Sequence, residues 1–387
     1  MGERYLAERI RGTGTTIFTE MSRLAVQHNA VNLGQAFPDF PGFAVAKEAA
    51  CDAIAWDHNQ YALMHGQPAL RHALAEHSQR FYGMEVDPEA HITVTCGATE
   101  AIFASILGLV NPGDEVVLFE PFYDSYLPAI RMAGGVPRAV TLRPPDFRVP
   151  ADELRAAFGP RTKAVIVNTP HNPTGHVFTR EELALIAELC QEHDAIAITD
   201  EVYEHIVFEG YQHLRLATLP GMWERTITIS SAGKTFSLTG WKVGWAITPE
   251  HLAPVVRRTH QFITFAGATP LQEAIAVALR AGDDYFDMLR REYQQRRDYM
   301  LDLFAEIGLP AYAPEGTYFV LVDIRETDFP DDVAFCRYLV TEIGVAAIPP
   351  TAFYINKEEG RHLVRFTFCK RWETLEAAAE RLARLRG

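Results

Sequence analysis

The chain has 387 residues, of which 48% are hydrophobic, so it is long enough to bury a large core. Its formal net charge of −14 argues against a surface that binds nucleic acid or anionic membranes. No apolar run reaches the roughly 18 residues that a membrane span requires, and the mixed charges of the first residues argue against a secretory signal. Five cysteines stand far apart without a CxxC pair, so we predict no metal site and no disulfide framework, and we expect a cytoplasmic protein.

Short β-branched segments alternate with helical patterns in the middle of the chain. Helical patterns cover 97–110 and 180–193. This alternation predicts an α/β layer with a mostly parallel sheet. The predicted strands of that sheet are 91–95, 115–119, 164–168, 195–199, 226–230 and 244–248.

The texture changes after about residue 280, where a charged helical pattern at 284–308 leads to strand patterns at 317–324 and 362–368. A terminal helix at 373–385 completes what we expect to be a smaller α+β domain. The first 47 residues carry few regular signals, and we expect them to pack on that domain. The predicted boundaries are 48–285 for the large domain and 1–47 with 286–387 for the small domain.

Lys234 follows the predicted strand at 226–230, within a Gly-Lys-Thr triplet that resembles the end of a phosphate-binding P-loop. A P-loop needs glycine six residues before the lysine, because its backbone N–H groups wrap the phosphates. Thr228 occupies that position, inside the strand, so the P-loop interpretation fails.

Polar residues also follow the neighbouring strands. The strand at 195–199 runs into Asp200, the strand at 164–168 runs into the segment 169–175, and the strand at 91–95 runs into Gly97-Ala98-Thr99. Ligands of α/β sheets collect at the carboxyl ends of the strands. A helix that begins at 97 offers free N–H groups to a phosphate. A lysine near a buried carboxylate and a phosphate cradle is what pyridoxal phosphate requires.

Four segments carry a family resemblance: NTPHNPTG (168–175), TDEVY (199–203), SSAGKTFSLTGWKVGW (230–245) and LVRFTFCK (363–370). They resemble the class I, fold-type-I aminotransferases that depend on pyridoxal phosphate. The nearer resemblance is to the kynurenine/glutamine–phenylpyruvate branch and to N-succinyldiaminopimelate aminotransferases. VNLGQAFPDFP, NQYALMHGQPALR, EPFYDSY and GVAAIPPTAFY extend the match over nearly the whole chain. The resemblance implies a large domain with a mostly parallel seven-stranded sheet between helices, plus a smaller α+β domain.

The resemblance also implies roles for residues around the cofactor. Lys234 resembles the Schiff-base lysine that carries a proton at the substrate's Cα. Asp200 resembles the partner of the pyridine nitrogen. Tyr203 and Asn172 would hydrogen-bond the phenolic oxygen, and Tyr123 would stack on the ring. The implied phosphate ligands are Gly97, Ala98, Thr99, Ser231, Lys242 (where many relatives have arginine) and, from the other subunit of a homodimer with shared active sites, Tyr61.

On the substrate side, Arg365 resembles the arginine that clamps the α-carboxylate. Gly34, Ala36 and Asn172 would face the substrate, and Phe18 and Phe265 would line its side-chain pocket. Ordinary structural explanations remain open for several of these residues: a helix cap for Asp200, a turn for Asn172, core packing for Tyr123, and a surface or core position for Tyr61.

The resemblance implies an enzyme that moves the amino group of an L-amino acid to a 2-oxo acid by ping-pong chemistry. The implied donors are kynurenine, glutamine, aromatic amino acids or methionine, or else N-succinyl-LL-diaminopimelate with 2-oxoglutarate as acceptor. A β-lyase would use the same lysine and cofactor and remains an alternative. A non-catalytic pyridoxal-phosphate-sensing domain is a more remote alternative, because regulators of that kind carry a basic DNA-binding domain and this chain is acidic.

Overall fold

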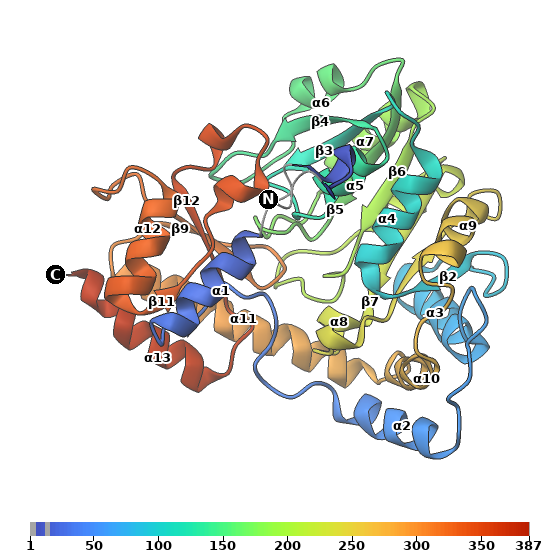
Figure 1. Ribbon diagram of the computed structural model, residues 1–387, viewed down its shortest axis with the longest axis horizontal. Helices are drawn as coiled ribbons and strands as arrows, with labels where there is room; N and C mark the ends of the chain where they lie inside the picture. The colour runs from blue at the N-terminus through green and yellow to red at the C-terminus, as the bar shows by residue number, and fades with distance from the viewer. Residues whose placement is uncertain (1–4, 12–15, 387) are drawn as a thin grey trace.

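The computed structural model describes residues 5–11 and 16–386. Its centre is a seven-stranded sheet with strand order β2-β8-β7-β6-β5-β3-β4 (Figure 1). Strand β8 runs antiparallel to both of its neighbours, and the other pairs are parallel, so the predicted mostly parallel sheet is confirmed. The strands are β2 (Ile92–Thr95), β3 (Glu115–Glu120), β4 (Val136–Thr141), β5 (Thr162–Asn168), β6 (Ile196–Asp200), β7 (Thr226–Ser231) and β8 (Gly244–Ile247).

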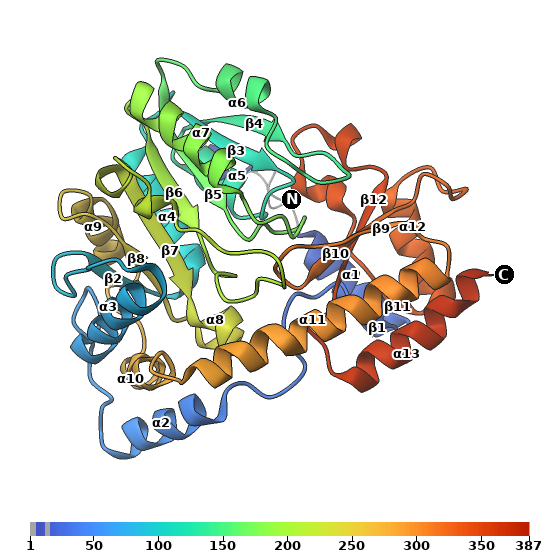
Figure 2. The same ribbon diagram turned by 180° about the vertical axis from the view of Figure 1, so that it is seen from behind.

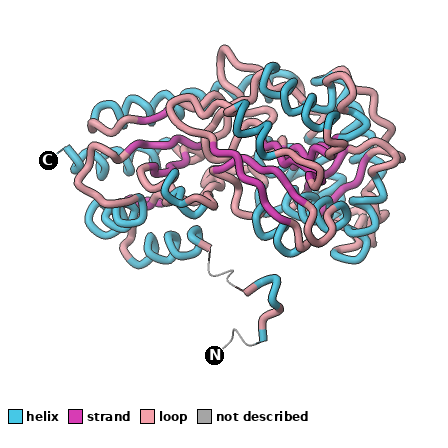
Figure 3. The backbone as a smooth tube through the Cα atoms, turned by 90° about the horizontal axis from the view of Figure 1, so that it is seen from above, coloured by secondary structure: helices cyan, strands magenta, loops and turns pink. Residues whose placement is uncertain are grey.

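Both faces of this sheet are buried, because successive side chains of a strand point to opposite faces. In β3, Val116 and Leu118 pack in the cluster that includes helices α4 (Gly97–Leu109), α5 (Tyr126–Met132) and α9 (Ala253–Ile263). Val117 and Phe119 pack on the opposite side, with α6 (Ala151–Ala157) and α7 (Arg180–Glu192). Figure 3 shows the strands enclosed between helices. A third cluster joins the β2 end of the sheet to α3 (Pro68–Tyr82), α10 (Thr269–Ala278) and, through Ala46, α2 (Ala44–Ala55).

A smaller α+β part lies beside the large sheet. Its antiparallel sheet has the order β12 (Leu363–Thr367), β10 (Phe319–Asp323), β9 (Ala311–Tyr312). A two-stranded sheet pairs β1 (Val31–Asn32) with β11 (Val345–Ala346), so this part of the N-terminal segment packs here. Helices α1 (Ile17–Gln27), α12 (Asp332–Tyr338) and α13 (Trp372–Leu382) cover these strands, and α11 (Asp283–Glu306) runs from beside α10 into this part (Figure 2). The exact domain boundaries stay a prediction.

Two of the elements that were not predicted, α1 and β4, illustrate why local patterns missed them. Residues 17–27 form a helix in a region where we expected few regular signals; Thr16 caps it by accepting a hydrogen bond from the backbone N–H of Thr19 (3.3 Å), and only Met21 and Ala25 are buried. Strand β4 was not predicted, because it is an edge strand whose first four residues are not buried. No helix in the described ranges combines the length and apolarity needed to cross a membrane.

Gly244 allows the beginning of α4 to lie directly against β8. A Cβ atom at residue 244 would come within 2.4 Å of the carbonyl carbon of Gly97 and 2.6 Å of the backbone nitrogen of Ala98. Both contacts are with backbone, which cannot rotate away as a side chain can.

We therefore expect Gly244→Ala to lower the free energy of unfolding by about 1–3 kcal/mol, the usual cost of overpacking. Urea denaturation followed by circular dichroism measures this change. Gly159→Ala is the control, because nothing lies within 4 Å of a Cβ there. Equal midpoints for the two variants would contradict the tight contact between β8 and α4.

Candidate active site

A cavity of about 150 Å³ lies at the carboxyl ends of the parallel strands, between the large sheet and the smaller part. The parallel direction of β5, β6 and β7 brings the residues that follow these strands to one edge. Most of the predicted site residues therefore line one space: Phe18, Ala36, Gly97, Ala98, Thr99, Tyr123, Asn172, Asp200, Tyr203, Ser231, Lys234, Lys242 and Arg365.

Lys234 extends into this cavity from α8 (Ala232–Thr235), the short helix that directly follows β7. Its Nζ donates a hydrogen bond to the hydroxyl of Tyr318 at 2.7 Å, and that hydroxyl donates to the carbonyl of Ala36 at 2.9 Å. Burial lowers the pKa of Lys234 to about 8, although the negative charge of Asp200 works in the opposite direction. An amine with this pKa can both accept and donate a proton near neutral pH.

Asp200 is the last residue of β6, and its side chain is buried. Its carboxylate accepts hydrogen bonds from the hydroxyl of Tyr126 at 2.7 Å and from the backbone N–H of Val202 at 3.3 Å. Burial raises the pKa of Asp200, and these two hydrogen bonds together with Lys234 oppose the increase. The cavity thus presents a carboxylate that is held in place and has a cationic group as its electrostatic partner.

The N-terminus of α4 forms another wall of the cavity. The side chain of the N-cap residue Cys96 makes no capping hydrogen bond, although the backbone N–H of Cys96 donates to the carboxylate of Glu100. Gly97 adopts a φ of +79°, which suits glycine. A Cβ at residue 97 would lie 3.0 Å from Nζ of Lys242, so the glycine lets the lysine approach the helix end. Uncapped N–H groups, the positive end of the helix dipole and a lysine are together suited to an anion such as phosphate.

Arg365 lies on β12 with 1% of its surface exposed. Its Nη1 donates to the side-chain oxygen of Asn172 (3.3 Å) and its Nη2 donates to the carbonyl of Gly34 (3.1 Å). The guanidinium carbon also lies 4.4 to 5.1 Å from the ring centres of Phe319, Phe18 and Phe353. Burial lowers the pKa of Arg365 to about 10, and its Nε has no hydrogen-bond partner among the described residues. A buried cation with an unused donor is suited to a carboxylate ligand.

Three predicted site residues, Gly34, Tyr61 and Phe265, do not line the cavity of the single chain. Gly34 contributes only its carbonyl, through the hydrogen bond with Arg365. Tyr61 is 88% exposed, and its ring meets that of Phe265 edge-to-face with 5.7 Å between the centres. Phe265 is itself 43% exposed.

Three polar side chains that contact the site residues were not predicted. Tyr318 holds Lys234, Tyr126 holds Asp200, and Asn168 joins two strand ends by donating to the carbonyl of Asp200 at 2.8 Å. Asn168 ends a predicted strand and could have been found by the same rule as Asp200. Tyr126 and Tyr318 meet their partners across long stretches of sequence, and no local pattern signals such contacts.

A buried polar network lies next to the Asp200–Tyr203 segment. Arg215 donates to Glu201 and to Glu204, both at 2.8 Å, and its guanidinium lies 3.7 Å from the centre of the Tyr82 ring. Glu204 also accepts from the hydroxyls of Tyr82 and of Ser230, both at 2.7 Å. The network therefore fixes the chain directly after Asp200.

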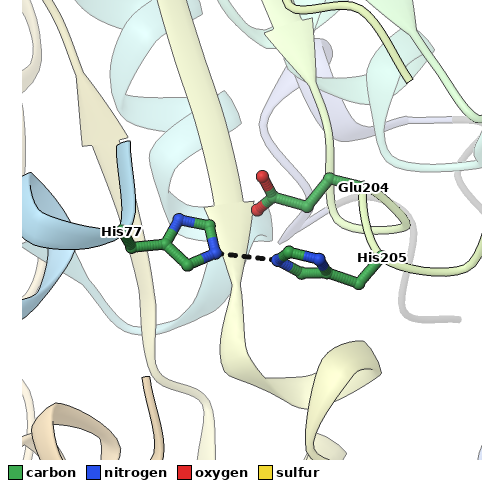
Figure 4. Close-up of side chains that lie close together, drawn as sticks. All are labelled: His77, Glu204 and His205. Carbon is green, nitrogen blue, oxygen red and sulfur yellow. Dashed lines mark hydrogen bonds between the residues drawn. The ribbon is translucent and has the colours of Figure 1, made fainter. Parts of the chain in front are cut away.

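His77 and His205 extend this network, and their Nε2 atoms contact each other at 2.7 Å (Figure 4). Within the described residues, His77, Glu204 and His205 alone offer three potential metal-ligand atoms within 4.8 Å of one another. The carboxylate of Glu204 is occupied by three hydroxyl or guanidinium donors, and the two rings are hydrogen-bonded to each other. These groups satisfy one another, and we infer no metal site from them.

The electrostatic pairing of Lys234 with Asp200 leads to a prediction for the protein without bound ligand. Because the carboxylate raises the pKa of the amine, Asp200→Asn should lower the pKa of Lys234 below its value of about 8. A ¹⁵N-lysine NMR titration measures the value, and Lys234→Ala assigns the signal. An unchanged or higher pKa in the Asp200→Asn variant would show that the carboxylate does not act on the amine.

Comparison with known proteins identifies the family. The model of the family "Aminotransferase class I and II" matches residues 28–382. The chain is 48% identical over 385 residues to a probable N-succinyldiaminopimelate aminotransferase of Mycobacterium tuberculosis, covering 97% of both chains. It is 45% identical over 372 residues to the methionine aminotransferase of Escherichia coli, covering 96% of both chains.

The solved structures agree with these relatives. The structure of the Mycobacterium tuberculosis N-succinyldiaminopimelate aminotransferase superposes with a TM-score of 0.96, at 48% identity, and covers 98% of this chain and 100% of that one. Family, fold and the arrangement of the cavity all lead to one assignment: this chain belongs to the class I and II aminotransferases, pyridoxal-phosphate-dependent enzymes that exchange an amino group between an amino acid and a 2-oxo acid.

Proposed function

We propose that the chain binds pyridoxal 5′-phosphate in the cavity and uses it for transamination. The observation that carries the proposal is the Lys234 amine at the end of β7, in the same cavity as Asp200. Burial lowers the pKa of this amine to about 8, against the opposing charge of Asp200. The charged and hydrogen-bonding groups around the cavity fit this cofactor. The uncapped N-terminus of α4 with Lys242 would hold the phosphate, and Asp200 would face the pyridine nitrogen.

When bound, the cofactor supplies an electron sink for the charge that develops at the amino acid's Cα. The chain supplies the proton transfer and the positioning. Lys234 would hold the cofactor and then, once released, remove the Cα proton and return a proton during the exchange. Arg365 would bind the α-carboxylate and so fix the direction of the Cα–H bond. Tyr203 and Asn172 would hydrogen-bond the phenolic oxygen, and Tyr123 would pack on the ring.

The donor that we propose has an uncharged side chain, of the kynurenine, glutamine, aromatic or methionine type, with a 2-oxo acid as acceptor. Among the described lining residues, the cations are Lys234, Lys242 and Arg365, and each already has a role. Phe18 and Ala36 leave an apolar side to the cavity. N-succinyl-LL-diaminopimelate is the second candidate, favoured by the 48% identity to the mycobacterial relative.

We further propose a homodimer in which each active site uses residues of both subunits. Tyr61 and Phe265 are exposed in one chain, and so is the neighbouring Phe262, with 84% of its surface accessible. Apolar surface of this extent favours an interface. In the dimer, Tyr61 would reach the phosphate of the partner's site.

The first prediction concerns the cofactor and the donor. The purified protein mixed with pyridoxal 5′-phosphate should show a visible absorption band that an amino donor bleaches and a 2-oxo acid restores. Borohydride reduction followed by peptide mass spectrometry should place the cofactor on Lys234, and Lys234→Ala should lose the band. The donor that bleaches it fastest identifies the substrate class; pyruvate and ammonia as products would indicate a β-lyase, and absence of any band would overturn the proposal.

The second prediction concerns the shared site. Lys234→Ala and Tyr61→Ala each damage a different part of one site, so each homodimer should be weak or inactive. If the site is shared, random mixing should restore about a quarter of the wild-type activity, because half of the dimers are hybrids and each hybrid has one intact site. Activity after mild unfolding and refolding of the mixture tests this. A mixture no more active than the separate variants would place Tyr61 in the site of its own chain or outside it.

A further inference from the structure

His176 is a buried residue that the proposed reaction does not use. It lies four residues after Asn172, in the loop between β5 and α7, with 2% of its surface exposed. Its Nδ1 lies 2.8 Å from a carboxylate oxygen of Glu315, and its Nε2 lies 2.9 and 3.1 Å from the two carboxylate oxygens of Glu182. Each ring nitrogen therefore faces a carboxylate.

This geometry favours the imidazolium form of the ring, with Glu182 and Glu315 as carboxylates. A neutral imidazole donates through one nitrogen only, so its second nitrogen would present a lone pair to a carboxylate. Burial alone would lower the pKa of His176, but the hydrogen bonds to Glu182 and Glu315 outweigh burial and raise it. Although burial raises the pKa of Glu182, its contacts with His176 bring that pKa down to about 2.

The charges around the ring balance. Arg148 reaches both carboxylates, with its Nη2 3.2 Å from Glu315 and its Nη1 3.7 Å from Glu182. Two cations thus face two anions. His171, the other nearby titratable group, has its pKa lowered to about 3 by burial and by the charge of His176, and its Nδ1 contacts Thr174 at 2.8 Å.

Of the three elements that meet at His176, one is the loop that carries Asn172, and another leads into β10, the strand next to that of Arg365. Glu182 is in the first turn of α7, in the large part of the chain. Glu315 precedes β10, and β10 pairs with β12 so that Leu321 stands opposite Arg365. His176 itself closes the loop that contains Asn172, through the hydrogen bond from the backbone N–H of His171 to its carbonyl at 2.9 Å.

The loop is fastened to the same segment by backbone contacts. The N–H groups of Glu315 and Gly316 both donate to the carbonyl of Gly175, at 3.0 and 2.8 Å. Gly175 has a φ of +75°, and a Cβ there would meet Pro314 at 2.2 Å. The position of Asn172 relative to Arg365, which are 3.3 Å apart, is therefore set across this junction.

We propose that protonated His176 is a positioning residue: its two N–H groups join the Asn172 loop, α7 and the segment before β10, and thereby hold Asn172 and Arg365 in register for the substrate carboxylate. The proposal rests on the function proposed above for Arg365. Loss of the His176 proton removes one of the two donors, so the junction loosens and the affinity for the carboxylate substrate falls.

The direction of the pH dependence follows from the raised pKa. The stabilisation from the imidazolium is fully present below the unfolded-state pKa of about 6.5 and is lost as the pH rises through the higher folded-state pKa. The KM for the amino donor should therefore increase on the alkaline side, whereas kcat changes less.

The test compares His176→Gln, His176→Lys and the control His171→Gln. His176→Gln is neutral and should raise the KM of the best donor about tenfold at neutral pH, the loss expected for one charge-assisted hydrogen bond. The His176→Gln substitution should also abolish the increase of KM at alkaline pH. His176→Lys keeps a cation that titrates near 10 and should restore a low KM and move the increase to higher pH. His171→Gln should leave the pH dependence of KM unchanged, because His171 is neutral in the fold.

Two further measurements do not depend on catalysis. NMR of ¹⁵N-histidine-labelled protein, assigned with His176→Gln, should show two protonated ring nitrogens at pH 7.5, and calorimetry with 2-oxoglutarate should show weaker binding to His176→Gln. A neutral ring at pH 7.5 would overturn the proposal, and so would a His176→Gln variant that loses stability while its KM and its affinity for 2-oxoglutarate stay at wild-type values. If no donor bleaches the cofactor band, the proposed function fails, and the NMR and calorimetric results still decide the role of His176.

Discussion

The parallel direction of β5, β6 and β7 is the constraint on which the site depends. Parallel strands end at the same edge, so the polar groups that follow them must share one small space. Asn168, Asp200 and Ser231 each end a strand of this sheet. The buried apolar faces of the strands fix their register, and the register in turn fixes the spacing of these side chains. The hydrophobic layers on both faces therefore determine the geometry of the chemistry at the edge.

The second structural requirement is the balance of buried charge. Lys234 and Arg365 are cations removed from water, which is tolerated only near compensating groups. Lys234 has Asp200 and the hydroxyl of Tyr318. Arg365 donates to two uncharged oxygen acceptors and lies against aromatic faces, and among the described residues the carboxylate of Asp124 acts on it without a direct ion pair. The network around Arg215 shows the opposite arrangement, with two carboxylates bound to one guanidinium. Lys234 and Arg365 can therefore still pair with a ligand, whereas the charge of Arg215 is balanced within the chain.

Much of the fold could be predicted from the sequence, because its central strands are short, β-branched and buried. The six predicted strands were all found, and the residues that follow four of them supplied most of the residues around the cavity. Strand β4 was missed because an edge strand that contains Pro137 and Arg138 lacks the apolar signal of a central one. Helix α1 was missed because it buries only Met21 and Ala25.

The contacts that hold the site could not be predicted in the same way. Tyr318 lies 84 residues from Lys234, and Glu315 lies 139 residues from His176. Such pairs depend on how the smaller part packs against the sheet. A local pattern of residue types does not predict that packing. The roles assigned to individual side chains still derive from the family resemblance, and the structure adds their distances and surroundings.

The unsatisfied hydrogen-bonding capacity of the buried Arg365 has a practical consequence. A guanidinium that is 1% exposed and has an unused Nε donor gains by pairing with any small carboxylate that reaches it. With Arg365 as the proposed site of the substrate carboxylate, acetate, formate or citrate in a buffer would compete with substrate, and the apparent KM would rise linearly with the buffer concentration. Rates measured in carboxylate buffers and in zwitterionic sulfonate buffers would then differ for this reason alone, before any difference in pH or ionic strength is considered.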